Sequence, residues 1–277
     1  MNISSIARSS RPSPRFAQAL ALLVLAALAA CSTRLTPTIA QVSGRSVEIV
    51  ESGAGAVTVV FESGLGDDWE PWDEVASEVA TRARVFAYSR PGYGDSDPTP
   101  APRDAARIVA DLRALLAARR VAPPYVLVGH SFGGTYMELF AKAHPAEVVG
   151  LVLVDTRHRS FTAACEEARI GGCAIPASAV PSLPQVEKDE YQAFGRSSDA
   201  IRAAGGFGAY PVRVLTATSH DGSAAYEALW RSLHGSLARE ATDGEQVVFE
   251  GAEHYLQTEH PREVARAILR LLPAPRP

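Results

Sequence analysis

The chain alternates short, continuously apolar runs with longer stretches in which apolar residues recur every three or four positions. Residues 125–128 and 148–154 are apolar runs, as expected of strands buried on both faces of a sheet. Residues 103–120 instead place Ile108, Leu112 and Leu115 at helical spacing. Regular alternation of these two patterns predicts a largely parallel sheet covered by helices on both faces.

The same rules assign the remaining elements. Predicted strands cover residues 47–51, 57–62, 85–88, 125–128, 148–154, 212–217 and 246–250, and predicted helices cover 69–82, 103–120, 135–144, 224–239 and 261–272. Strands 47–51 and 57–62 are separated only by a turn, Ser-Gly-Ala-Gly, so we expect them to form an opening hairpin.

Residues 156–210 break this alternation with Gly, Pro, Ala and scattered charges. The segment is too long for a simple loop in a compact domain, and we expect an inserted cap with short helices at 185–194 and 198–204. Cys165 and Cys173 lie inside it, and in an oxidising compartment two cysteines so close together predict a disulfide. Two free buried thiols are the alternative.

The first 30 residues have the layout of a secretory signal peptide, with three arginines before an almost purely Ala, Leu and Val run. The run ends in Leu-Ala-Ala-Cys-Ser at 28–32, which resembles the lipobox of bacterial lipoproteins. The resemblance implies that Cys31 is lipid-modified, that residues 31–45 form a tether, and that the protein faces the periplasm, with Ser32 favouring the outer membrane. The alternative is a secreted protein with an incidental cysteine.

Length and charge limit the function classes further. The net charge is −4, and loss of the arginine-bearing signal peptide makes it more negative, so nothing indicates a nucleic-acid partner. The remaining residues, 46–277, suit one α/β domain with its cap. We expect a monomer that associates with a membrane through the anchor.

The segment 129–134, Gly-His-Ser-Phe-Gly-Gly, carries the strongest chemical signal. It lies between a predicted strand and a predicted helix, and a sharp strand-to-helix turn between glycines exposes a nucleophilic serine. Ser131 is therefore the candidate nucleophile. A serine hydroxyl needs a base with a pKa near 7, which indicates histidine.

Four separated motifs together resemble those of the α/β-hydrolase superfamily over about residues 47–272. They are 129–134, Phe-Glu-Ser-Gly-Leu-Gly at 61–66, Tyr-Ser-Arg-Pro-Gly-Tyr-Gly-Asp-Ser at 88–96, and Gly-Ala-Glu-His at 251–254 followed by Pro261. The resemblance implies a mostly parallel eight-stranded sheet flanked by helices, with the cap inserted after the sixth strand.

His254 is the candidate base, because it follows the last predicted strand and the triad order places histidine last. His130 is interpreted as structural, and His220 and the other histidines as surface or packing residues. Two acids compete. Asp155 ends the sixth strand, an alternative acid position in some lipases and dehalogenases, whereas Asp221 falls late for the commonest position after the seventh strand.

The oxyanion hole requires two backbone N–H groups, one from the residue after the nucleophile and one from the loop after the third strand. These are assigned to Phe132 and Leu65. Arg90, Asp95 and Ser96 are interpreted as holding a turn near the site.

The leading functional hypothesis is a serine hydrolase that cleaves a carboxylic ester or related acyl compound through an acyl-enzyme on Ser131, with no metal or organic cofactor. Epoxide hydrolases and haloalkane dehalogenases carry an aspartate at this position, which argues against both. Perhydrolase, C–C hydrolase, thioesterase and peptidase variants stay open. A non-catalytic envelope binding protein on the same fold is the alternative of another class.

Replacing Cys31 by serine should move the protein from the membrane fraction to the soluble periplasmic fraction, because the acyl chains that anchor it would be lost. Fractionation followed by immunoblotting measures this. Retention of Cys31→Ser in the membrane fraction would contradict the anchor.

Overall fold

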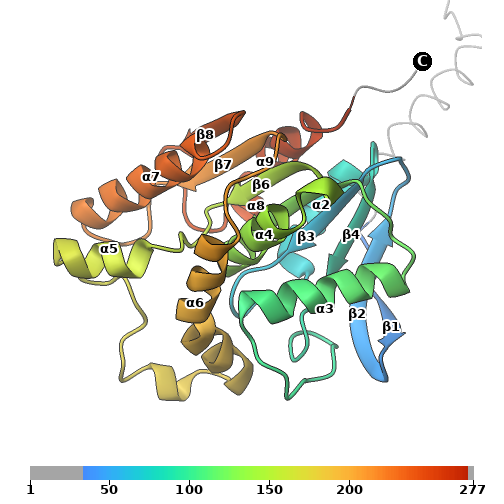
Figure 1. Cartoon of the computed structure of the whole chain (residues 1–277), viewed down its shortest axis with the longest axis horizontal. Coiled ribbons are helices and arrows are strands. Elements are labelled where there is room, and N and C mark those ends of the chain that lie inside the picture. Colours follow the sequence, from blue (N-terminus) through green and yellow to red (C-terminus); the bar gives the residue numbers. More distant parts are fainter. Residues whose placement is uncertain (1–33, 274–277) are drawn as a thin grey trace, which may run out of the picture. The chain divides into compact units, whose positions relative to one another are not determined.

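The computed structural model describes residues 34–273, and within them eight strands form one sheet (Figure 1). The strand order is β1-β2-β4-β3-β5-β6-β7-β8. Strands β3 to β8 run parallel, whereas β2 pairs antiparallel with β1 and β4. The strands are β1 (Thr38–Val42), β2 (Arg45–Ser52), β3 (Thr58–Glu62), β4 (Arg84–Tyr88), β5 (Tyr125–His130), β6 (Val148–Val154), β7 (Val212–Ala217) and β8 (Gly244–Phe249). The expected mostly parallel eight-stranded sheet is confirmed.

Alternate side chains of the central strands point into two separate cores. Val60, Leu127 and Leu153 pack with α3, α4, α6 and α7, whereas Val59 and Val128 pack with α2 and α9 on the opposite face. The helices are α2 (Asp73–Ala80), α3 (Ala105–Ala118), α4 (Phe132–Ala143), α5 (Phe161–Ala168), α6 (Gln185–Ala203), α7 (Ala224–Arg239), α8 (Leu256–Glu259) and α9 (Pro261–Leu269), with short 3-10 turns η1 (Glu70–Trp72), η2 (Pro145–Glu147) and η3 (Val180–Ser182). Burial on both faces explains why the central strands are continuously apolar.

The pairing of β5 with β6 sets the position of the site. His130 pairs with Val154, and Val154 pairs with Leu215 of β7. Ser131 and Asp155, each one residue further on, therefore emerge side by side at the carboxyl edge of the sheet. In open α/β sheets ligands bind at this edge.

Two expectations at the start of the sheet differ from the structure. The predicted hairpin of 47–51 with 57–62 is wrong, because β2 pairs with β1 and β4 while β3 lies between β4 and β5. Residues 38–42, which the sequence pattern assigns to the tether, form the edge strand β1. The signal peptide and Cys31 lie outside the described residues.

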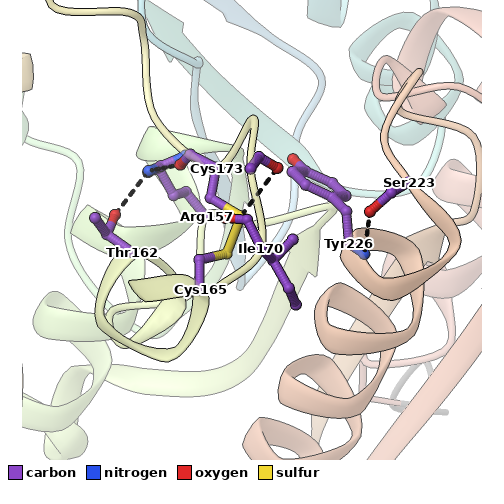
Figure 2. Close-up of a disulfide and its surroundings, with 8 residues drawn as sticks. Arg157, Thr162, Cys165, Ile170, Cys173, Ser223 and Tyr226 are labelled. Carbon is purple, nitrogen blue, oxygen red and sulfur yellow. Dashed lines mark hydrogen bonds between the residues drawn. A yellow bond between two sulfur atoms is a disulfide. The ribbon is translucent and has the colours of Figure 1, made fainter. Parts of the chain in front are cut away.

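The cap follows β6, as expected after the sixth strand, but its helices differ from the prediction. The two short helices predicted at 185–194 and 198–204 are one continuous helix, α6, and α5 was not predicted. The Cys165–Cys173 disulfide is present (Figure 2). It packs with Phe161 against Trp230 of α7, so the first part of the cap shares a small core with the main domain.

In the part of the chain from residue 34 to 273, the helices are too short or too polar to cross a membrane.

Candidate active site

Ser131 occupies a strained turn between β5 and α4. Its backbone has φ 51° and ψ −120°, a conformation that non-glycine residues rarely adopt and that often marks functional sites. A Cβ on Gly129 would lie 2.6 Å from the Gly133 carbonyl oxygen, and one on Gly133 would lie 2.4 Å from the carbonyl oxygens of Glu62 and Ser63. Glycine is therefore required at both positions, as a nucleophile elbow demands.

Ser131 and His254 are joined directly. The Ser131 Oγ and the His254 Nε2 lie 3.0 Å apart, and the His254 Nδ1 lies 2.7 Å from the Asp155 Oδ2. With Nδ1–H donating to the carboxylate, Nε2 is left free to accept the serine proton. The structure thus brings Ser131, His254 and Asp155 together, and it leaves Asp221 exposed in the loop after β7.

Asp155 is fully buried and accepts four hydrogen bonds. Its Oδ1 accepts from the Ala217 backbone N–H at 2.9 Å and from the Trp230 Nε1–H at 2.8 Å, and its Oδ2 accepts from His254 and His220 at 2.7 Å each. Burial by itself would raise the pKa of this carboxyl, but the hydrogen bonds from the two histidines outweigh burial and hold the pKa well below its usual range. The carboxylate is therefore ionised whenever the fold is intact near neutral pH.

His220 is the main site residue that the sequence interpretation misses. Its Nε2 lies 2.7 Å from the Asp155 Oδ2, and its Nδ1 lies 2.7 Å from the Glu227 Oε2. A carboxylate that is ionised only accepts hydrogen bonds, so this arrangement favours the form of His220 in which both ring nitrogens carry hydrogen, the imidazolium. Burial opposes this charge, but the two carboxylates raise the pKa of His220 overall.

Helix α7 supplies the second layer around the acid. Glu227, Trp230 and His234 lie at helical spacing on one face of α7. Glu227 binds His220, Trp230 binds Asp155, and the His234 Nε2 lies 2.8 Å from the Thr156 carbonyl oxygen. The apolar periodicity of α7 predicts the helix, but nothing in the sequence shows which strand end these side chains face.

The loop after β3, which carries Leu65, is fixed against the elbow. Arg90 donates to the Ser63 and Gly64 carbonyl oxygens, each at 2.7 Å, and forms ion pairs with Glu62 and with Glu190 of α6. The other assigned oxyanion residue, Phe132, begins α4, where a backbone N–H has no helical acceptor. Arg90 thus has a structural role, as expected, but the loop that it holds is the one after β3, which it also ties to the cap.

His130 holds the histidine loop in place. Its Nε2 lies 3.0 Å from the His254 carbonyl oxygen, and the two rings are 4.6 Å apart. Burial lowers the pKa of His130, so the neutral ring donates this hydrogen bond. Its geometry agrees with the structural role expected from the sequence.

A cavity of about 310 Å³ opens on Ser131 and His254, and Phe132, Arg157 and Trp230 are among its other lining residues. Its volume lies within the range of small-molecule sites.

Asp155, His220 and His254 are also candidate ligands of a metal ion, because their side-chain oxygen and nitrogen atoms lie within 4.8 Å of one another. Two ligand atoms that each bind a tetrahedral zinc ion at about 2.0 Å are roughly 3.3 Å apart. Here one nitrogen of each histidine lies only 2.7 Å from the Asp155 Oδ2, which is a hydrogen-bond distance. The arrangement suits shared protons rather than a metal ion.

Replacing His220 by glutamine should destabilise the protein more at about pH 6 than at about pH 9. A raised folded-state pKa gives stability that is complete below the unfolded-state pKa, about 6.5, and is lost as the pH rises through the folded-state value. Urea unfolding of wild type and His220→Gln at both pH values measures the difference. His260→Gln, at a side chain 37% exposed, is the control. Equal destabilisation at both pH values would contradict a charged His220.

Comparisons with known proteins agree with this architecture. A family model described as the α/β hydrolase fold matches residues 57–172. The uncharacterised protein YqjL of Bacillus subtilis is 27% identical over 223 residues, which cover 78% of this chain and 83% of YqjL. The chain spans only 15% to 37% of the length of several other curated relatives.

Solved structures show the same fold at low sequence identity. An epoxide hydrolase of Vigna radiata superposes with a TM-score of 0.69 at 18% identity, covering 86% of this chain and 98% of that one. A membrane phospholipase A described as a bacterial virulence factor superposes with a TM-score of 0.59 at 20% identity, covering 94% and 98%. The chain therefore has the α/β-hydrolase fold.

Proposed function

We propose that the protein is a serine hydrolase that cleaves a carboxylic ester through an acyl-enzyme on Ser131. The observation that carries the proposal is the unbroken hydrogen-bonded chain from the Ser131 hydroxyl through His254 to the buried Asp155. Ser131 also lines a cavity large enough for a small substrate.

In this mechanism the Ser131 Oγ attacks the ester carbonyl carbon while His254 Nε2 takes its proton. Asp155 holds the ring in the required tautomer and stabilises the imidazolium that forms. The backbone N–H groups of Phe132 and Leu65 would stabilise the tetrahedral oxyanion. His254 then protonates the leaving alcohol. Water, deprotonated by the same histidine, releases the acid and restores Ser131.

The hydroxyl at the elbow favours acyl transfer over epoxide opening, although epoxide hydrolases are among the structural neighbours. Attack of a serine on an epoxide would give an ether, which water does not readily cleave, whereas an acyl ester on serine is hydrolysed with the same base. Perhydrolase, C–C hydrolase and peptidase variants of the enzyme would use the same serine nucleophile. In the alternative of a binding protein, Ser131 would not react at all.

We also propose that the enzyme works in the bacterial envelope, held to the membrane by a lipid on Cys31. The signal peptide and the lipobox-like segment before Cys31 support this location. The Cys165–Cys173 disulfide is consistent with an oxidising compartment.

A fluorophosphonate probe should label the wild-type protein and should not label Ser131→Ala. The probe phosphonylates only an activated serine, so labelling reports the nucleophile without knowledge of the substrate. Gel fluorescence measures labelling, and hydrolysis of p-nitrophenyl butyrate measures ester cleavage. Ser232→Ala, at an exposed position of α7, controls for nonspecific modification. If the folded wild-type protein remains unlabelled, the proposed serine hydrolase activity would be contradicted and a binding protein would be favoured.

Replacing Asp155 by asparagine should lower kcat on the order of several thousandfold, because the amide stabilises neither the productive tautomer nor the imidazolium. Asp221→Asn, at the exposed rival position, should change kcat little. The comparison is made on one ester with both variants checked for folding by circular dichroism. A larger loss in Asp221→Asn than in Asp155→Asn would overturn the assignment of the acid.

A further inference from the structure

Arg157 lies two residues beyond the proposed acid and is anchored to the elbow by its backbone. Its N–H donates to the Ser131 carbonyl oxygen at 3.0 Å, and its own carbonyl oxygen accepts from the Thr135 hydroxyl at 2.8 Å. These two bonds fix the start of the Arg157 side chain relative to the nucleophile.

The guanidinium lies among three aromatic rings at the base of the cap. Its central carbon is 5.1 Å from the Phe194 ring centroid, 5.5 Å from that of Phe161 and 5.7 Å from that of Phe132. One terminal nitrogen, Nη2, donates to the Thr162 hydroxyl and to the Cys173 carbonyl oxygen, each at 2.9 Å (Figure 2). The disulfide-closed segment therefore orients the cation.

Arg157 differs from the other shielded arginines in its lack of a counter-charge. Arg90, Arg103 and Arg159, with side chains 1%, 5% and 12% exposed, each form an ion pair with at least one glutamate. Within residues 34–273, Arg157 has no carboxylate within 4.0 Å, and its buried Nε has no hydrogen-bond partner. A shielded cation is costly unless an anion pairs with it.

The environment of Arg157 is consistent with a missing anion. Burial lowers the pKa of its guanidinium, opposed only by the nearby phenols of Tyr226 and Tyr191. Arg157 also lines both the cavity that contains Ser131 and a second cavity of about 360 Å³ between α5 and α6. Arg157 is thus shared by the linings of both cavities.

We propose that Arg157 binds an oxyanion of the substrate, so that the preferred ester carries a carboxylate or phosphate group in addition to the bond that is cleaved. This inference rests on the proposed ester hydrolysis at Ser131. Its Nη2 hydrogens are already used by Thr162 and Cys173, so the Nη1 N–H groups are the ones that can donate to an oxygen of either anion.

The acidic residues of the Ser131 cavity favour one orientation of such a substrate. Asp221 and Glu253 are exposed lining residues in the loops after β7 and β8, beside His220 and His254. Their charges disfavour an anion beside these two loops, where His220 is already paired with Asp155 and Glu227. Arg157, in the loop after β6, is the arginine among the lining residues of the cavity.

The test compares esters that differ only in the anion. p-Nitrophenyl hydrogen glutarate and p-nitrophenyl valerate have acyl chains of equal length, with a carboxylate or a methyl group at the end. We expect wild type to show the higher kcat/KM on the glutarate ester. Arg157→Gln should reduce the glutarate-to-valerate ratio by about 10- to 100-fold, the usual effect of a hydrogen bond to a charged group.

Two further variants separate recognition from other effects. Arg157→Lys keeps the charge and should restore part of the ratio. Arg202→Gln removes the same charge from another residue of the second cavity, one already paired with Asp199, and should leave the ratio unchanged. Butyryl glycerol phosphate against monobutyrin gives the phosphate comparison. Equal kcat/KM for the anionic and neutral members of both pairs in wild type would overturn the proposal.

Binding by a catalytically inactive variant distinguishes failure of this inference from failure of the proposed function. Glutarate or inorganic phosphate should raise the Tm of Ser131→Ala but not that of the double variant with Arg157→Gln. If these Tm shifts are found but the wild type hydrolyses no ester, the proposed hydrolase activity would be contradicted and the anion site would still be supported. Equal Tm shifts in both variants, or none, would overturn the anion site whatever the activity.

Discussion

The buried Asp155 carboxylate organises the carboxyl edge of the sheet. Four N–H donors converge on it, one each from the end of β7, the loop after β7, helix α7 and the loop after β8. A charge without water must be fully hydrogen-bonded, so these segments must pack together in one arrangement. The same arrangement places His254 against Ser131, which couples the stability of the edge to the geometry of the site.

A consequence of this coupling is that Asp155 is shared between two histidines. When His220 is protonated, its charge, held on the other side of the ring by Glu227, balances part of the carboxylate charge that His254 faces. A simple serine, histidine and acid arrangement lacks this second cation. The site is therefore better described as an array that runs from Ser131 to Glu227.

Arginines connect the cap to this edge in two different ways. Arg90 is fully paired, and its bonds to Glu190 of α6 and to the loop after β3 make it a structural clamp. Arg157 is held by aromatic rings and neutral acceptors instead. Complete pairing suits a permanent contact, whereas an unpaired cation beside a cavity suits a ligand.

Local patterns predicted much of the fold because they depend on neighbouring residues. Apolar runs identified β6 and β7, and helical spacing identified α3 and the full extent of α7. The predicted hairpin failed because strand pairing is not local: β2 reaches across to β4. The cap helix α6 was split in the prediction because its stability comes from packing on α3 and α4 rather than from its own sequence.

The sequence by itself determined the elbow at Ser131, the histidine loop and the fold class, since each depends on a short motif or on periodicity. It left Asp155 and Asp221 as alternatives and treated His220 as an ordinary surface or packing residue. Only the tertiary structure decided which carboxylate meets His254, because the register of β5, β6 and β7 sets which strand ends lie side by side. The same register set Arg157 beside Ser131.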